Sequence, residues 1–200
     1  NLPADYMANS SSYGVLYVLD GEYVFEFAKG AVAFLSNAFG YMPPLIVVGI
    51  PNIDRGRDMT VRFDESDRYE GFLEFLENEL VPYINSNYRT NGFDILYGWS
   101  SASNINMQLL ARSPNLFDAH IQSGTGIGNK TATFLTEHLS NNEFANSFLY
   151  ANVEGSGPRL KGLENYQRLI ETLSPKGLNY KFEVLKSSSH VNVLAEGIYN

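Results

Sequence analysis

Short, nearly continuous apolar runs alternate along the chain with longer segments whose apolar residues recur every three or four positions. The apolar runs predict buried strands, and the periodic segments predict amphipathic helices. The expected strands cover residues 15–19, 45–50, 93–97, 119–122, 147–153 and 180–185. The expected helices cover residues 23–37, 69–85, 104–112, 134–139, 163–173 and 191–199, and Pro82 marks a kink or an end in the second of them.

Strands that are apolar on both faces and alternate with helices predict an α/β fold. The expected architecture is a mostly parallel central sheet with helices on both faces, in three α/β/α layers. Ligand sites in such sheets lie at the carboxyl ends of the strands. Residues 51–68 are polar and irregular, which predicts a long loop. The 200 residues are expected to form a single domain, residues 1–200.

Composition narrows the range of partners and cofactors. The net charge of −8 disfavours nucleic acid, which needs a basic face. No apolar run approaches the roughly 20 residues that span a bilayer. The chain has no cysteine, its three histidines lack metal-ligand spacing, and neither a metal nor a cofactor is expected. The amino terminus lacks an initiator Met and a signal-peptide pattern, so we expect that upstream residues are missing. The compartment, cytoplasmic or periplasmic and secreted, and the oligomeric state stay open.

The strand predicted at residues 93–97 runs directly into Gly98-Trp99-Ser100-Ser101-Ala102, and a helix follows at once. In the nucleophile elbow of α/β-hydrolases, a serine lies between a strand and a helix, with one small residue two positions before it and another two positions after it. The turn exposes the Ser100 hydroxyl and leaves the Ser101 N–H at a helix N-terminus, where it can stabilise an oxyanion. The alternative is an ordinary strand-to-helix loop, in which small residues and serines are common.

Several longer segments carry a family resemblance. Five segments resemble the putative-esterase (esterase D-like) branch of the α/β-hydrolases, and they occur in the same order as in that family. They are residues 16–21 (Leu-Tyr-Val-Leu-Asp-Gly), residues 42–50, the Arg-x-Arg-Asp-x-Thr pattern at 55–60, residues 72–88 and the surroundings of His190. That branch includes feruloyl, acetyl-xylan and siderophore esterases, S-formylglutathione hydrolases and mycolyl transferases. The chain departs from the family pattern in lacking N-terminal strands, in its sequence after Thr60, and in an elbow that reads GWSSAS in place of GHSxGG.

Acyl transfer through a serine requires a base and a group that orients the base. His190 follows the last predicted strand, which fits the α/β-hydrolase order of serine, acid and histidine, so it is the expected general base. Glu154 is the first carboxylate after the strand at 147–153 and is the expected acid, with Glu164 as a weaker substitute. Glu154 could equally be an exposed residue of a Gly-rich turn, and a Ser-His dyad remains an alternative.

The remaining candidates surround this site. The resemblance implies that the second oxyanion donor is the backbone N–H near Gly21. Trp99 is expected to form an aromatic substrate wall, and Arg57 is expected to bind substrate. Arg55 and Arg57 have an alternative role, which is to pair with Asp54, Asp58 or Asp64 and fix the loop. Of the other two histidines, His120 is expected to be buried and hydrogen-bonded, and His138 is expected to face solvent.

Together these features predict a serine esterase that hydrolyses a small carboxylic ester or thioester through an acyl-enzyme on Ser100. An acyltransferase would use the same acyl-enzyme with an alcohol as acceptor, and a non-catalytic binding protein could keep the fold without the reaction. The intact pair of Ser100 and His190 argues against the last alternative.

Overall fold

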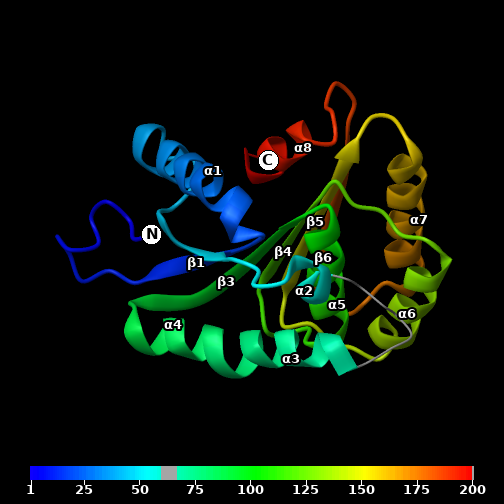
Figure 1. Cartoon of the computed structure of the whole chain (residues 1–200), viewed down its shortest axis with the longest axis horizontal. Helices are drawn as coiled ribbons and strands as arrows, with labels where there is room; N and C mark the ends of the chain where they lie inside the picture. The colour runs from blue at the N-terminus through cyan, green and yellow to red at the C-terminus, as the bar shows by residue number, and fades with distance from the viewer. Residues whose placement is uncertain (60–66, 200) are drawn as a thin grey trace.

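The computed structural model describes residues 1–59 and 67–199, and it contains one parallel sheet (Figure 1). Within the described residues, six strands lie in the order β2-β1-β3-β4-β5-β6, and each neighbouring pair is parallel. The strands are β1 (Tyr13–Leu19), β2 (Leu45–Ile50), β3 (Thr90–Trp99), β4 (Ala119–Ser123), β5 (Ser147–Glu154) and β6 (Leu178–Leu185). The predicted parallel sheet is therefore confirmed, and each expected strand lies where its apolar run placed it.

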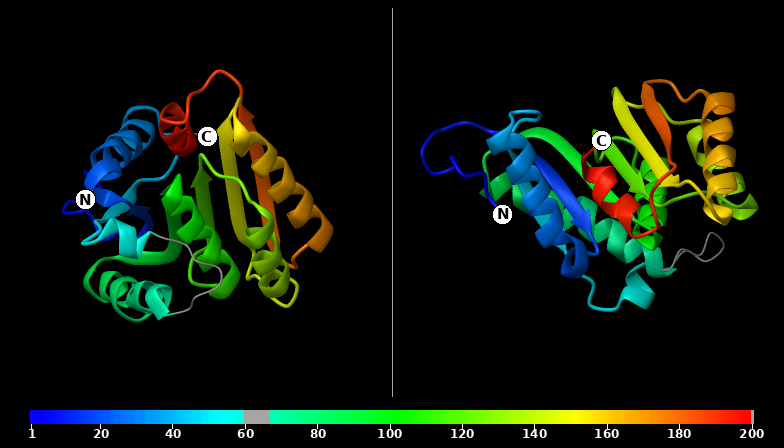
Figure 2. Two further views of the ribbon diagram at one scale, coloured as in Figure 1. Left: turned by 45° about the vertical axis from the view of Figure 1, so that its right-hand side comes forward. Right: turned by 90° about the horizontal axis from the view of Figure 1, so that it is seen from above.

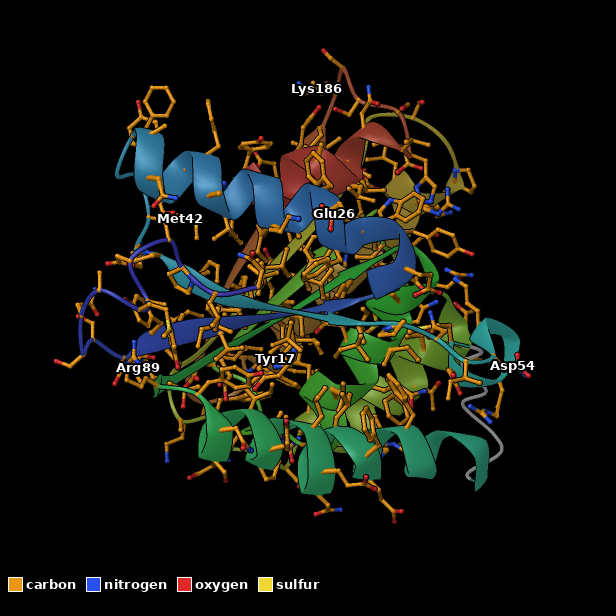
Figure 3. The ribbon with its side chains drawn as sticks, turned by 60° about the vertical axis from the view of Figure 1, so that its left-hand side comes forward. Tyr17, Glu26, Met42, Asp54, Arg89 and Lys186 are labelled. Atoms are coloured by element: carbon orange, nitrogen blue, oxygen red, sulfur yellow. The ribbon has the colours of Figure 1, made fainter. Side chains whose placement is uncertain are left out.

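Helices cover both faces of this sheet (Figure 2). One face packs against α1 (Gly21–Ala33) and α8 (Asn192–Tyr199), through a core that includes Val18, Val24 and Leu45. The opposite face packs against the remaining longer helices, where Tyr17 lies fully buried in the core below the sheet (Figure 3). These helices are α3 (Asp67–Phe75), α4 (Val81–Asn87), α5 (Ser101–Arg112), α6 (Asn129–Leu139) and α7 (Pro158–Leu173). The expected three-layer α/β/α architecture is thus confirmed.

Two π-helical turns interrupt the long helices. One, η1 (Phe34–Ala38), extends α1, so the helix expected at 23–37 is present in two parts. The other, η2 (Leu76–Leu80), joins α3 to α4 immediately before Pro82. Proline cannot donate a backbone hydrogen bond to the preceding turn, and a wider turn accommodates this loss. Pro82 therefore changes the helical register, and the helix continues to Asn87.

The largest departures from the predicted elements lie at helix starts. Helix α7 begins at Pro158, five residues before the expected start, because proline suits the first turn of a helix. The loop expected at residues 51–68 contains a short helix, α2 (Arg55–Asp58), whose first turn is capped by the Asp54 side chain. The expected change in the loop after Thr60, and any pairing with Asp64, lie outside the described residues.

The strand order indicates which part of the carboxyl edge of the sheet is suited to bind a ligand. From β1 the chain adds β2 on one side, and from β3 it adds β4, β5 and β6 on the other side. The direction of winding therefore reverses between β1 and β3. In open α/β sheets the ligand crevice lies outside the carboxyl ends of the strands at such a reversal. The residues that follow β1 and β3 are Asp20 and Ser100.

Candidate active site

The turn between β3 and α5 holds Ser100 in a strained conformation. Its φ and ψ are 58° and −119°, which few residues other than glycine adopt. The backbone N–H of Ser100 donates to the Ser123 carbonyl oxygen of β4 at 2.9 Å, and this bond ties the turn to the neighbouring strand. A Cβ on Gly98 would lie 2.6 Å from the Ala102 carbonyl oxygen, so only glycine fits there. The methyl group of Ala102 is fully buried and is accommodated, although the family pattern has glycine at this position.

His190 faces this serine from the loop between β6 and α8. Its Nε2 atom lies 3.0 Å from Ser100 Oγ, within the range of a hydrogen bond. The side chain is 26% exposed, so solvent reaches the pair from one side. The imidazole is therefore placed to accept the proton of the Ser100 hydroxyl.

Glu154 occupies the other side of the imidazole. It is the last residue of β5, and its Oε2 atom lies 3.3 Å from His190 Nδ1. The second oxygen, Oε1, accepts a hydrogen bond from Arg159 at 3.0 Å. Burial acts to raise the pKa of Glu154, but hydrogen bonds from its own backbone N–H, from His190 and from Arg159 outweigh burial and hold the pKa below its usual range. The group is thus a buried carboxylate that keeps its charge.

The two expected oxyanion donors, Ser101 and Gly21, are each the first residue of a helix that follows a strand. Ser101 is the first residue of α5, so its N–H has no partner within the helix. Gly21 is the first residue of α1 and follows β1, the strand beside β3. A Cβ on Gly21 would lie 2.6 Å from the Ile50 backbone nitrogen, which shows how closely this turn packs against β2. Both expected oxyanion donors thus lie at helix N-termini at the carboxyl edge of the sheet.

An ion pair between the buried Asp20 and the exposed Arg55 braces the turn before Gly21, and it was not predicted from the sequence. Asp20 has a left-handed φ of 53° and accepts two hydrogen bonds from Arg55, both at 2.9 Å. Asn52 donates a third hydrogen bond to Asp20 at 2.7 Å. The alternative role of Arg55 was to pair with acids of its own loop, but among the described residues its ion-pair partner is Asp20 and not Asp54 or Asp58. The acid that it contacts lies 35 residues earlier, where only the fold brings it close.

The two expected substrate contacts, Trp99 and Arg57, have intramolecular partners. The indole Nε1–H of Trp99 donates to the His190 backbone carbonyl at 2.9 Å. Arg57 pairs with Asp58 at 2.6 Å, as the alternative interpretation of the loop predicted. Arg57 is nevertheless half exposed and, with Ile50 and other apolar side chains, lines a cavity of about 680 Å³.

The other two histidines lie away from the serine. His120 is fully buried, its Nδ1 atom is 2.6 Å from Asn106 Oδ1, and burial lowers its pKa to about 3. The expectation of a buried, hydrogen-bonded histidine is confirmed. His138 was expected to face solvent, but it is half-buried against the Phe134 ring, with Nδ1 at 2.9 Å from the Phe134 carbonyl oxygen.

Arg159 is the second contact that the sequence analysis missed. It lies five residues after Glu154, in the first turn of α7, and its charge opposite a predicted catalytic acid is the signal that could have identified it. Across residues 1–59 and 67–199, no group of three potential metal ligands comes together. None of the helices in these ranges is long and apolar enough to cross a membrane.

Comparisons with known proteins identify the family of this chain. Residues 1–163 match the family model described as Putative esterase. The ferri-bacillibactin esterase BesA of Bacillus subtilis (strain 168) is 25% identical in an alignment of length 218, and the alignment covers 92% of this chain and 75% of that protein. An IroE-like serine hydrolase from Shewanella oneidensis has a TM-score of 0.88 at 28% identity, over 100% of this chain and 72% of that one. The siderophore hydrolase EstB from Aspergillus nidulans shares the fold, with a TM-score of 0.77 at 19% identity over 95% of this chain and 81% of that one.

The matched region covers most of the sequence and includes the elbow. The chain therefore belongs to the esterase family of the α/β-hydrolases, and it is a serine ester hydrolase.

Proposed function

We propose that Ser100, His190 and Glu154 form the catalytic triad of this esterase. The observation that carries the proposal is the continuous chain of contacts from Ser100 Oγ through the imidazole to the Glu154 carboxylate, at 3.0 and 3.3 Å. His190 takes the hydroxyl proton as Ser100 attacks the ester carbonyl, and it then gives the proton to the leaving alcohol. Water then attacks the acyl-enzyme while His190 takes a proton from the water. His190 returns that proton to Ser100 as the carboxylic acid is released.

The two backbone donors, Ser101 and Gly21, stabilise the negative oxygen of the tetrahedral intermediates. Each N–H lies at the positive end of a helix, and donors of this kind are worth roughly 10²–10³ in kcat. Glu154 fixes the imidazole in the tautomer that presents Nε2 to the serine, and its charge stabilises the imidazolium that forms. Arg159 supports this role because it helps to keep the buried carboxylate ionised.

We propose further that the natural substrate is a siderophore ester. The support is the similarity over nearly the whole chain to a protein named ferri-bacillibactin esterase. Hydrolysis of a trilactone siderophore, followed by chromatography of the released acids, tests this assignment separately from the chemistry. Efficient cleavage of p-nitrophenyl acetate with no cleavage of the siderophore would leave the esterase intact and reject the substrate.

Three variants test the catalytic roles with p-nitrophenyl acetate. Ser100→Ala should abolish turnover, and a fluorophosphonate should label the unmodified protein at Ser100 but leave this variant unlabelled. His190→Gln should reduce kcat by several orders of magnitude. Glu154→Gln keeps the shape of the acid but loses its charge, and a triad predicts that kcat falls to roughly 10⁻⁴ of its starting value.

Glu164→Gln is the matched control, because it makes the same change on an exposed position of α7. It should leave kcat unchanged. A Glu154→Gln variant with nearly full activity would show that the enzyme works with a Ser-His dyad. Turnover that survives in Ser100→Ala would reject the proposed nucleophile.

A further inference from the structure

Two contacts join Trp99 to His190, and they act on different parts of the histidine. The indole Nε1–H donates to the His190 backbone carbonyl at 2.9 Å. The indole and imidazole rings also stack, with 5.2 Å between their centroids and 29° between their planes. Trp99 is the last residue of β3, whereas His190 belongs to a loop 91 residues later in the chain. A side chain on the rigid sheet thus holds both the main chain and the ring of a loop residue.

The stack leaves the imidazole little freedom. Its two nitrogens face Ser100 and Glu154, one ring face lies against Trp99, and its Cε1 atom lies over Gly124, the residue after β4. A Cβ on Gly124 would be 2.8 Å from His190 Cε1 and 3.3 Å from Trp99 Nε1. The indole N–H and one face of the ring are therefore occupied by the protein itself, which leaves them unavailable to a substrate.

We propose that Trp99 is a positioning residue for His190 and does not form the wall of a substrate pocket. The inference rests on the proposed function, since it assigns Trp99 a role through the general base. During each chemical step the imidazole becomes an imidazolium. An indole face attracts a cation more strongly than any other aromatic side chain does. Trp99 therefore stabilises His190 most in the transition state, while it also fixes the direction of the ring.

Kinetics of two variants separate positioning from substrate binding. Trp99→Phe keeps an aromatic face but loses the N–H donor, and Trp99→Leu loses both. We expect kcat to fall by about three- to thirtyfold in Trp99→Leu and by less in Trp99→Phe, with KM unchanged. The factor should be the same for the p-nitrophenyl esters of acetate, butyrate and benzoate. A rise in KM at constant kcat, or a loss that depends on the acyl group, would overturn the proposal.

Fluorescence of the unmodified protein tests the contact without any turnover. Trp99 is the only tryptophan among the 200 residues, so emission excited at 295 nm comes from this side chain. A protonated imidazole in contact with indole quenches its emission. We expect His190→Gln to raise the emission at a fixed pH, because this variant removes the ring that contacts the indole.

Other charged groups near His190 define a further control. Glu154 faces the imidazole from β5, and Arg159 lies behind Glu154 from α7. Glu154→Gln should therefore keep the emission below that of His190→Gln, because it leaves the imidazole ring against the indole. Identical emission from His190→Gln and from the unmodified protein would refute the stacked contact. That result would leave the proposed function intact. The proposed function fails only if Ser100→Ala retains turnover.

Discussion

A buried carboxyl group at the opposite end of the sheet from the site should reduce the stability of this protein at neutral pH. Asp94 lies near the start of β3 and is 6% exposed. Burial, followed by the charge of Asp118, raises its pKa from 3.8 to about 6. The Asp118 carboxylate is held close because it accepts a hydrogen bond from the Asp94 backbone N–H at 2.7 Å. The other polar neighbours of Asp94 are Asn85 and the hydroxyl of Tyr17.

The sign of the effect follows from proton binding in the two states. Between pH 4 and pH 6 the folded protein keeps the Asp94 proton, whereas the unfolded chain has lost it. The folded state binds more protons in this range, so the free energy of unfolding falls as the pH rises. A shift of two pKa units corresponds to about 3 kcal/mol, which is the cost of the buried charge at pH 7. Asp94→Asn removes the ionisation and should recover up to that amount.

Urea unfolding followed by circular dichroism between pH 4 and pH 8 measures this difference. We expect Asp94→Asn to match the unmodified protein near pH 4 and to exceed its free energy of unfolding by about 3 kcal/mol at pH 7. Asp118→Asn is the matched control, since it removes only the second cause of the shift and should give a smaller gain. A stability difference for Asp94→Asn that does not change with pH would refute the reasoning.

Three further predictions concern the site and use p-nitrophenyl acetate hydrolysis. Gly98→Ala should reduce kcat at least 100-fold, because its methyl group would collide with the first turn of α5 and displace the serine. Arg55→Met should lower kcat about tenfold with KM unchanged, because Asp20 would no longer be braced beside the oxyanion turn, and Arg55→Lys should retain part of the lost rate. Arg159→Met should raise the pKa of Glu154, so the acidic limb of the kcat–pH profile should move to higher pH while the rate at pH 8 changes little. An unchanged profile for Arg159→Met would show that the ion pair does not hold the carboxylate in its charged form.

The parts of this protein that sequence predicts best are those governed by local periodicity and local sterics. Strand β1 is buried at all seven positions, so its apolar run is unambiguous. The elbow is equally local, because the need for a small residue at Gly98 arises from a contact only four residues away. The positions of His190 after β6 and of Glu154 at the end of β5 followed from the order of elements along the chain. Their directions did not, because the direction of a side chain in a loop or at a strand end depends on what packs around it.

Contacts between distant segments account for most of what the sequence could not predict. Arg55 had three acids close by in sequence, yet it pairs with Asp20 on the neighbouring strand end. The contact exists because β1 and β2 are adjacent and parallel, so the residues that follow them meet at one edge. The contact between Trp99 and His190 was not predicted for a similar reason, since the two residues lie 91 positions apart. Contacts between such distant residues can be predicted only once the strand order is known.

Strand spacing also explains why only glycine fits at position 124, next to the site. Ser100 and Glu154 lie at the ends of β3 and β5, which are separated by β4 and are therefore about 10 Å apart. A single imidazole with a hydrogen bond on each side spans a gap of this size, so the ring of His190 must lie across the end of β4. The residue at that end is Gly124, whose φ is +62° and whose Cβ would lie 2.8 Å from the imidazole. The sheet thus sets the distance between nucleophile and acid, and it requires a residue without a side chain beneath the base that joins them.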